Sequence, residues 1–207
     1  MQGDEYLPFL RRILTSKRLE HSLQVRGVMA DLAEIYGLDR EQALVAGLLH
    51  DAAKDLGEAE WAKLVAEAGI TITHEAERDY GHSLHGPVGA YLVAKELAVS
   101  NPLILDAITS HTYYGDVGSF DAPLSWCLRF SDLLEPTRDW SRVSWLRRNV
   151  PRLRDAAYGG RLSEAAAIQT GSLIGWFTEL GMAIHPNMHR AWAEKSAVLG
   201  VDESFVQ

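Results

Sequence analysis

Apolar residues recur at helical spacing along almost the whole chain, and this feature constrains the fold more than any other. In the stretch 17–36, Val25, Val28, Met29 and Leu32 fall on one face of a helix. We find no convincing segment with the period-two alternation of a half-buried strand, and no internal repeat. The pattern therefore predicts an all-α protein.

Capping residues and helix breakers divide this pattern into separate helices. Gly37 is placed to end the first helix, and Asp39 begins the next, with Gln42 in the position of a capping box. Residues 43–49 are apolar on every side, which is typical of a central buried helix. A loop with a short turn is expected over 70–84, and a second loop is expected over 112–121. Further helices are expected over about 58–68, 87–98, 102–111, 121–135, 140–157, 163–180 and 187–199.

Composition narrows the class of protein. The chain has 207 residues, 47% of them hydrophobic, and no linker rich in Pro, Ser or Gly divides it, so a single domain is expected. The formal charge of −8 argues against nonspecific binding to nucleic acid or to anionic membranes. The lone Cys127 excludes an intrachain disulfide and is interpreted as a core residue. Without a signal peptide or a long apolar run, we expect a cytoplasmic protein.

Several ionisable side chains lie at helix ends or on apolar helix faces, so they are expected to point inward. His21, for example, shares a face with Val25 and Val28, and His50 ends the apolar helix over 43–49. These inward groups are His21, His50, His85, His111 and Asp132. Their positions suggest that they converge on one pocket.

Taken singly, an inward histidine is more often a hydrogen-bonded core residue than a ligand. A carboxylate on a core face is a stronger signal, because an unpaired buried charge is very costly. Several such groups in one core need partners, and a metal ion is an economical one. The adjacent His50 and Asp51 add weight, since imidazole nitrogen and carboxylate oxygen are good metal ligands and a carboxylate can bridge two ions.

The order of the motifs resembles a known family. His21, the run Leu48-Leu49-His50-Asp51-Ala52-Ala53-Lys54 and the distant Asp132 look like the H…HD…D signature of HD-domain phosphohydrolases. Further motifs over 85–90, 110–112, 132–138 and 181–186 are similar to one branch, the YqeK-type symmetrical bis(5′-nucleosyl)-tetraphosphatases. The resemblance covers roughly residues 18–195. It implies one HD domain over 1–207, a helical bundle with a core at about 18–140 and extra C-terminal helices at about 140–200 packed on it.

The resemblance also implies a two-metal site and a substrate. By position, His21, His50, Asp51 and Asp132 hold one ion, and Asp51, His85 and His111 hold the second, with Asp51 bridging. The metal is expected to be iron, although such ligands also suit manganese, zinc or nickel. The expected reaction is symmetrical cleavage of diadenosine tetraphosphate to two ADP by a bridging water that the metals activate.

Three further residues are predicted to bind the phosphate chain. Lys54 lies three residues after Asp51, and Arg138 can clamp phosphate with its two-pronged guanidinium. Thr112 follows His111 and offers a hydroxyl. The alternative interpretation of Lys54 and Arg138 is a surface cation paired with a neighbouring acid.

The chain also departs from the family pattern. Relatives often have Gly-Arg soon after the His-Thr pair, whereas this chain has Tyr113-Tyr114-Gly115-Asp116, which leaves the preferred substrate open. His74 and His82 are expected at the surface or behind the ligands, although His82 could also reach the phosphate path; His185 and His189 are expected to be structural. The alternatives are a nucleotidase or phosphodiesterase acting on mononucleotides or cyclic nucleotides, and a metal-bearing nucleotide sensor without catalysis. Oligomeric state, including a homodimer, stays open.

Overall fold

The computed structural model describes residues 3–112 and 122–197, and in these ranges every regular element is helical. The helices are α1 (Leu7–Ile13), α2 (Ser16–Tyr36), α3 (Arg40–Leu49), α4 (Glu58–Glu67), α5 (His85–Leu97), α6 (Pro102–Ser110), α7 (Pro123–Leu134), α8 (Ser144–Tyr158), α9 (Leu162–Glu179) and α10 (Pro186–Ala197). The prediction of an all-α protein is confirmed. None of these described helices has both the length and the apolar character that a membrane span requires.

Caps fix the ends of the helices that carry the site. The Thr15 hydroxyl accepts a hydrogen bond from the backbone N–H of Arg18 and caps α2, which ends at Gly37 with a left-handed φ of 62°. The Asp39 carboxylate accepts from the backbone N–H of Gln42 at 2.8 Å, as the capping pattern predicts. Residues 43–49 of α3 are all buried, which confirms a central helix.

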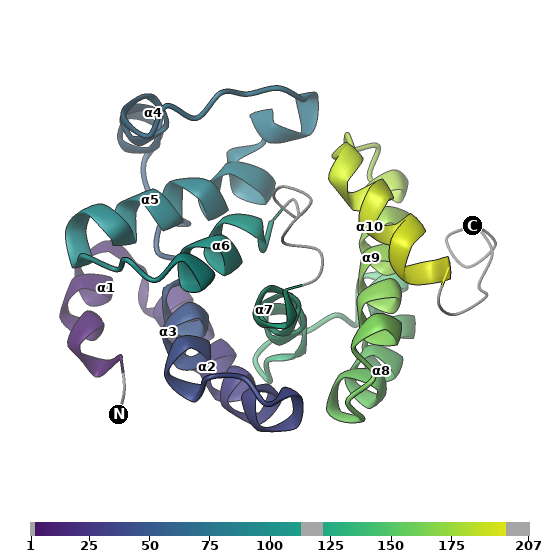
Figure 1. Ribbon diagram of the computed structural model, residues 1–207. Helices are drawn as coiled ribbons and strands as arrows, with labels where there is room; N and C mark the ends of the chain where they lie inside the picture. The colour runs from purple at the N-terminus through teal and green to yellow at the C-terminus, as the bar shows by residue number, and fades with distance from the viewer. Residues whose placement is uncertain (1–2, 113–121, 198–207) are drawn as a thin grey trace.

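Helix α7 lies in the middle of the molecule and is seen end-on in Figure 1. It packs against α2, α3 and α6 on one side and against α8 and α9 on the other. Helices α5 and α6 pack on each other, and α6 also contacts α3. The buried side chains of these helices form one continuous core, with Trp126 and Phe130 of α7 fully buried in it.

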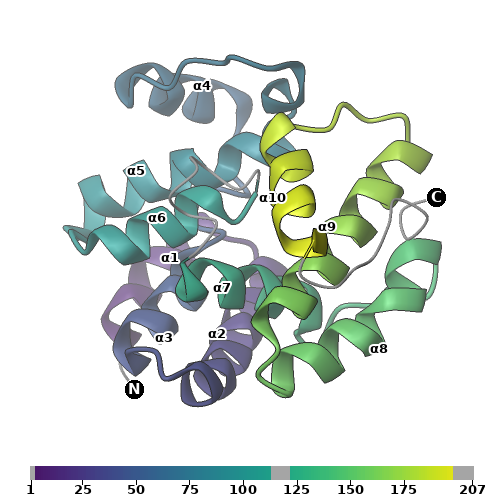
Figure 2. The ribbon, with the colours of Figure 1, turned by 45° about the vertical axis from the view of Figure 1, so that its right-hand side comes forward.

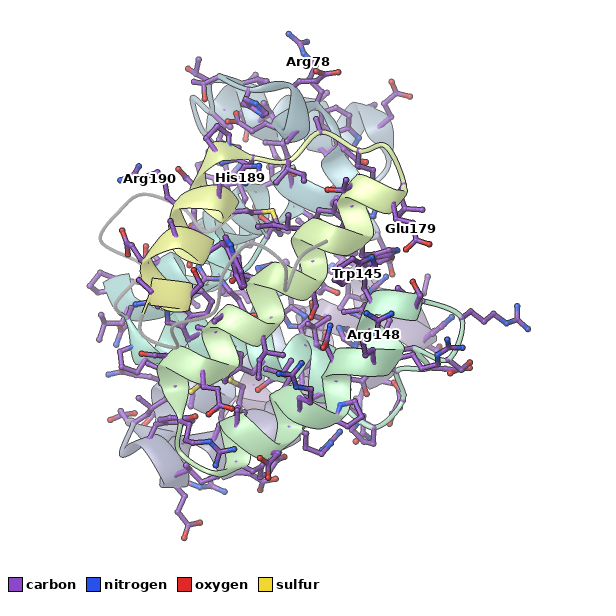
Figure 3. All side chains as sticks on the ribbon, turned by 90° about the vertical axis from the view of Figure 1, so that its right-hand side faces the viewer. Arg78, Trp145, Arg148, Glu179, His189 and Arg190 are labelled. Carbon is purple, nitrogen blue, oxygen red and sulfur yellow. The ribbon has the colours of Figure 1, made fainter. Side chains whose placement is uncertain are left out.

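The C-terminal helices α8, α9 and α10 form a separate layer, which is the face turned toward the viewer in Figure 3. Helix α9 packs against both α8 and α10. The segment between α4 and α5 approaches α10 in Figure 2, and there the His185 ring contacts the buried carboxylate of Glu77 at 2.9 Å. The C-terminal layer and the first half of the chain are thus joined above the centre of the bundle.

Three local expectations need correction. The stretch 70–84 contains a 3-10 turn, Glu75–Arg78, and a π-helical turn, Tyr80–Leu84, that leads directly into α5. Helix α5 therefore starts at His85, before Pro87. Helix α8 begins at Ser144 rather than at 140, and the N-terminal helix α1 had not been predicted.

The close approach of α8 and α9 gives a prediction about stability. A Cβ at Gly175 would lie 2.5 Å from the ring of Trp145 (labelled in Figure 3), so Gly175→Ala must push the helices apart. We expect a loss of about 1–3 kcal/mol in the free energy of unfolding, measured by denaturant titration. Gly27→Ala is the matched control, because nothing lies within 4 Å of its added Cβ and alanine favours the helix. Equal stability of Gly175→Ala and the wild type would contradict this packing.

Candidate metal centre

The six residues predicted as metal ligands converge in the interior of the bundle. They come from α2, the end of α3, the start of α5, the end of α6 and α7. They are His21, His50, Asp51, His85, His111 and Asp132. All except Asp132 are buried, and about a quarter (26%) of the Asp132 side chain is exposed.

The carboxylate of Asp51 stands between two groups of histidines. Its Oδ2 atom lies 3.5 Å from Nε2 of His21 and 3.6 Å from Nε2 of His50. Its Oδ1 atom lies 3.2 Å from Nε2 of His85 and 3.8 Å from Nε2 of His111. In each group the potential ligand atoms all lie within 4.8 Å of one another. Each oxygen of this one carboxylate thus faces its own group of histidines.

In three of the imidazole rings, Nδ1 contacts an oxygen acceptor on the side away from the cluster. His50 contacts the carbonyl oxygen of Gly47 at 2.9 Å, and His111 contacts that of Ile108 at 2.6 Å. His21 contacts the carboxylate of Glu135 at 3.0 Å. An Nδ1–H donated to such an acceptor leaves the lone pair on Nε2, which is how metal-binding histidines are usually oriented.

The surroundings of the Nε2 atoms show whether these residues fit a metal ion. Within the described part of the chain, the buried Nε2 of His50 has no hydrogen-bond partner. The Nε2 atoms of His85 and His111 face each other at 3.1 Å, where at most one of them can donate a hydrogen bond. Divalent cations, one beside each group of histidines, would give all three nitrogens a partner, so the donor set fits metal binding.

The ionisation of the cluster agrees with this interpretation. Burial lowers the pKa of His50 to about 4 and that of His85 to about 3, so both rings are neutral at pH 7. Burial opposes the ionisation of Asp51, but the surrounding imidazoles of His50, His111 and His85 outweigh burial and hold the pKa of this carboxyl well below its usual value. Neutral imidazole and ionised carboxylate are the forms that bind metals.

Asp132 approaches the same cluster from α7. Its Oδ1 atom lies 3.0 Å from Nε2 of His21 and 3.9 Å from Nε2 of His50, which places it with the first group of histidines. Although burial lowers the pKa of His21, the hydrogen bond and charge of Asp132 outweigh it and raise that pKa. Arg138 binds the same Oδ1 atom at 2.5 Å and in turn holds the pKa of Asp132 well below its usual value against burial.

Both predicted phosphate-binding cations turn toward the cluster. Helix α3 ends at Leu49, so Lys54 is placed by hydrogen-bonded turns rather than by a continuing helix. The Nζ of Lys54 donates to the carbonyl oxygen of Gly81 and lies 3.3 Å from Nδ1 of His85. Burial lowers the pKa of Lys54. Arg138 lies over the ring of Trp140, 5.3 Å from its centroid. Of the alternative pairing with a neighbouring acid, one contact is present: Nε of Arg138 lies 3.8 Å from Oε1 of Glu135, although this carboxylate is buried rather than at the surface.

Two residues near the cluster were not assigned a role from the sequence. Arg18 binds Oδ2 of Asp51 at 2.8 Å, and it lies three residues before His21 on the same helix. Glu135 receives the Nδ1 contact of His21 and hydrogen bonds from the hydroxyl and backbone N–H of Thr137. The signal that could have found them is helical spacing, because each lies three residues from a predicted ligand.

A cavity of about 180 Å³ opens beside the cluster, and we call it the inner cleft. Asp51, His85, His111 and Asp132 lie on its wall together with Lys54, Thr112 and Arg138. The Thr112 hydroxyl donates to the carbonyl oxygen of Ser83 at 2.6 Å. All three predicted phosphate contacts are therefore in one cavity with four of the six predicted ligands.

The remaining histidines lie outside the cluster. His185 is buried against Glu77 and stacks edge-on with His74, and His189 is exposed. His82 is half-exposed, binds Asp79 and lines the inner cleft. The predicted loop departure at 113–116 lies outside the described residues.

Comparison with known proteins gives a consistent result. The HD domain family model matches residues 18–137. A Bacillus subtilis relative named symmetrical bis(5′-nucleosyl)-tetraphosphatase is 32% identical over 72% of this chain and 77% of its own length. A relative of the same name from Halalkalibacterium halodurans is 30% identical over 71% of this chain and 76% of its own length. A crystal structure from Clostridium acetobutylicum, described as a predicted HD superfamily hydrolase involved in NAD metabolism, has a TM-score of 0.79 and 27% identity over 94% of this chain and 96% of its own.

Proposed function

Because the chain belongs to the HD domain family, and within it to the family of the symmetrical bis(5′-nucleosyl)-tetraphosphatases, we propose that it hydrolyses diadenosine tetraphosphate and related dinucleoside polyphosphates to two nucleoside diphosphates. The observation that carries the proposal is the position of Asp51, whose two oxygens face two different histidine clusters beside a cleft that also contains cations.

In this proposal the six predicted ligands hold two divalent cations. His21, His50 and Asp132 would hold one ion, His85 and His111 would hold the other, and Asp51 would serve both. Iron is the proposed metal, although imidazole and carboxylate also suit manganese, zinc or nickel. When bound, such a pair activates water and neutralises the charge that builds on the phosphate oxygens.

The protein's own side chains orient the polyphosphate. Diadenosine tetraphosphate carries several negative charges, and Lys54 and Arg138 supply cations on the wall of the inner cleft. Thr112 adds a hydroxyl at the same wall. Arg18 forms an ion pair with Asp51, and Arg138 forms one with Asp132, which fixes the positions of both guanidinium groups. Hydrolysis of the central phosphoanhydride consumes one water and leaves two ADP.

Product analysis tests this proposal. The purified protein, loaded with Fe²⁺ or Mn²⁺ without oxygen, is incubated with diadenosine tetraphosphate, and the nucleotides are separated by anion-exchange chromatography. Two ADP per substrate is the expected result, and chelation of the metal should abolish the reaction. AMP plus ATP would contradict symmetrical cleavage. Activity only on mononucleotides, cyclic nucleotides or NAD would favour another HD-type reaction.

We predict that Arg138→Lys lowers the specificity constant for diadenosine tetraphosphate by about tenfold or more, or about 1.4 kcal/mol of transition-state stabilisation. An ammonium group cannot reproduce the planar two-pronged contact of a guanidinium. Arg142→Lys makes the same change at an exposed nearby position and should leave the rate unchanged. If Arg138→Lys and Lys54→Ala both retain the wild-type specificity constant, the phosphate contacts lie elsewhere.

A further inference from the structure

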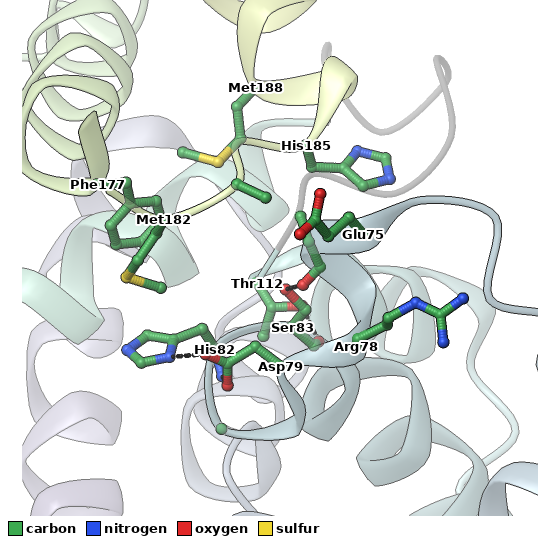
Figure 4. A pocket seen from close by; sticks show the side chains of 13 residues that line it. Glu75, Arg78, Asp79, His82, Ser83, Thr112, Phe177, Met182, His185 and Met188 are labelled. Carbon is green, nitrogen blue, oxygen red and sulfur yellow. Dashed lines mark hydrogen bonds and ion pairs between the residues drawn. The ribbon is translucent and has the colours of Figure 1, made fainter. Parts of the chain in front are cut away.

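A second and larger cavity, about 640 Å³ in volume, adjoins the inner cleft. We call it the outer pocket, and Figure 4 shows its lining. One wall is the turn between α4 and α5, including Glu75, Asp79 and His82, and the opposite wall comes from the end of α9 and the start of α10. The two cavities share Gly81, His82, Thr112 and Phe177 in their linings, so they meet at these residues.

We propose that the outer pocket binds one purine nucleoside of the dinucleotide while its phosphates lie in the inner cleft. This inference rests on the proposed function, because a symmetrical substrate carries a nucleoside on each side of the bond that is cut. A cleft of about 180 Å³ is too small for phosphates and a nucleoside together, whereas 640 Å³ lies in the range of about 300–1,000 Å³ that is typical of small-molecule pockets.

The apolar wall suits a flat, uncharged ring. Phe177, Met182 and Met188 project from the α9 and α10 side in Figure 4. A half-buried phenyl ring can stack with a base, and methionine side chains adapt to irregular shapes. The His82 ring already packs edge-on against Phe177, with centroids 6.0 Å apart.

The two cavities differ in the charge of the side chains that line them. The wall formed by the turn between α4 and α5 carries the carboxylates of Glu75 and Asp79, with Arg78 as a cation, whereas the inner cleft contains the cations Lys54 and Arg138 beside the predicted metal ligands. Carboxylates repel phosphate but accept hydrogen bonds from ribose hydroxyls and from amino groups of a base. The distribution therefore favours the nucleoside in the outer pocket and the phosphate chain in the inner cleft.

His82 marks the passage between the two cavities. Its Nδ1 contacts Asp79 at 2.9 Å, and its backbone N–H donates to the same carboxylate at 3.1 Å, so the ring is fixed in orientation. Thr112 lies at the same junction, where its hydroxyl is held by the carbonyl oxygen of Ser83. A dinucleotide that spans both cavities passes these two side chains.

The test fills the outer pocket without touching the predicted ligands. Ala183 lines this pocket in the turn before α10, so Ala183→Trp should raise the KM for diadenosine tetraphosphate by about tenfold or more with little change in kcat. Leu180→Trp is the matched control, because Leu180 is 55% exposed, lies three residues earlier and is not in the lining. Ala183→Leu adds less bulk and should give an intermediate KM, which keeps the test valid if the tryptophan variant fails to fold.

A binding measurement separates this inference from the proposed function. Adenosine, added to metal-free protein and followed by NMR saturation transfer, should bind the wild type and Leu180→Trp equally, Ala183→Leu more weakly, and Ala183→Trp weakest of all. A wild-type KM in both Ala183 variants, or unchanged adenosine binding, would overturn the inference even if the enzyme cleaves the dinucleotide. If the wild type cleaves no dinucleotide, the proposed function fails, and adenosine binding alone decides what the pocket accepts.

Discussion

Asp51→Asn is expected to lower the rate of diadenosine tetraphosphate hydrolysis by at least about a thousandfold, which corresponds to about 4 kcal/mol in the activation free energy. Asp51 is the one predicted ligand whose oxygens face both histidine clusters. An amide keeps the shape of the side chain but has no charge to balance two cations. Metal content, measured by elemental analysis after gel filtration, should fall in parallel with activity.

The fold should survive this substitution. Asp51 is crowded by buried polar groups, and removal of a buried charge can stabilise a protein that has no metal bound. Circular dichroism should therefore show unchanged helical content. Asp55→Asn is the control, because Asp55 also lies near Arg18 but belongs to neither metal-binding group, and it should retain both metal and activity. Full activity of Asp51→Asn would exclude the two-metal mechanism.

Gly86→Ala should have the next largest effect, a loss of activity of about 10–100-fold or more. A Cβ at Gly86 would lie 2.8 Å from the carbonyl oxygen of Thr109 and 3.0 Å from that of Ile108, so α5 and α6 must separate. The Ile108 carbonyl holds Nδ1 of His111, and His85 is the neighbour of Gly86 in the chain. The substitution therefore disturbs two predicted ligands of one ion at once.

Gly89→Ala provides a control in the same helix. The nearest atom to its added Cβ is the carbonyl oxygen of His50 at 3.6 Å, which is an ordinary contact. We expect Gly89→Ala to retain near wild-type activity and Gly86→Ala to lose both metal affinity and about 1–3 kcal/mol of folding stability. Similar activity of the two variants, measured with equal metal loading, would show that the contact between α5 and α6 does not set the geometry of the site.

The helices could be predicted because periodicity and caps are local. Asp39 caps α3 through the backbone of Gln42, and Gly37 adopts the left-handed conformation expected at the end of α2. The π-helical turn before α5 could not be predicted, because its geometry depends on packing between segments distant in sequence. Its Gly81 carbonyl binds Lys54, and Ser83 accepts the Thr112 hydroxyl.

The convergence of the candidate site could be predicted in outline for a similar reason. His21 and His50 lie on apolar helix faces, which forces their side chains inward whatever the arrangement of the helices. Spacing cannot show which oxygen of Asp51 faces which histidine, or that Arg18 binds that carboxylate, because these relations depend on how α2, α3 and α5 cross. The outer pocket could not be predicted from the sequence, because its two walls, residues 75–83 and 177–188, lie about a hundred residues apart in the chain.

Metal titration of the apo protein tests the central claim most directly. Increasing Fe²⁺ or Mn²⁺ is added without oxygen, and the formation of ADP from diadenosine tetraphosphate is measured at each ratio of metal to protein. If two ions bind around a shared Asp51, the rate of ADP formation should saturate at two ions per chain, with ADP as the sole nucleotide product. Saturation at one ion per chain, or undiminished hydrolysis in excess chelator, would contradict it.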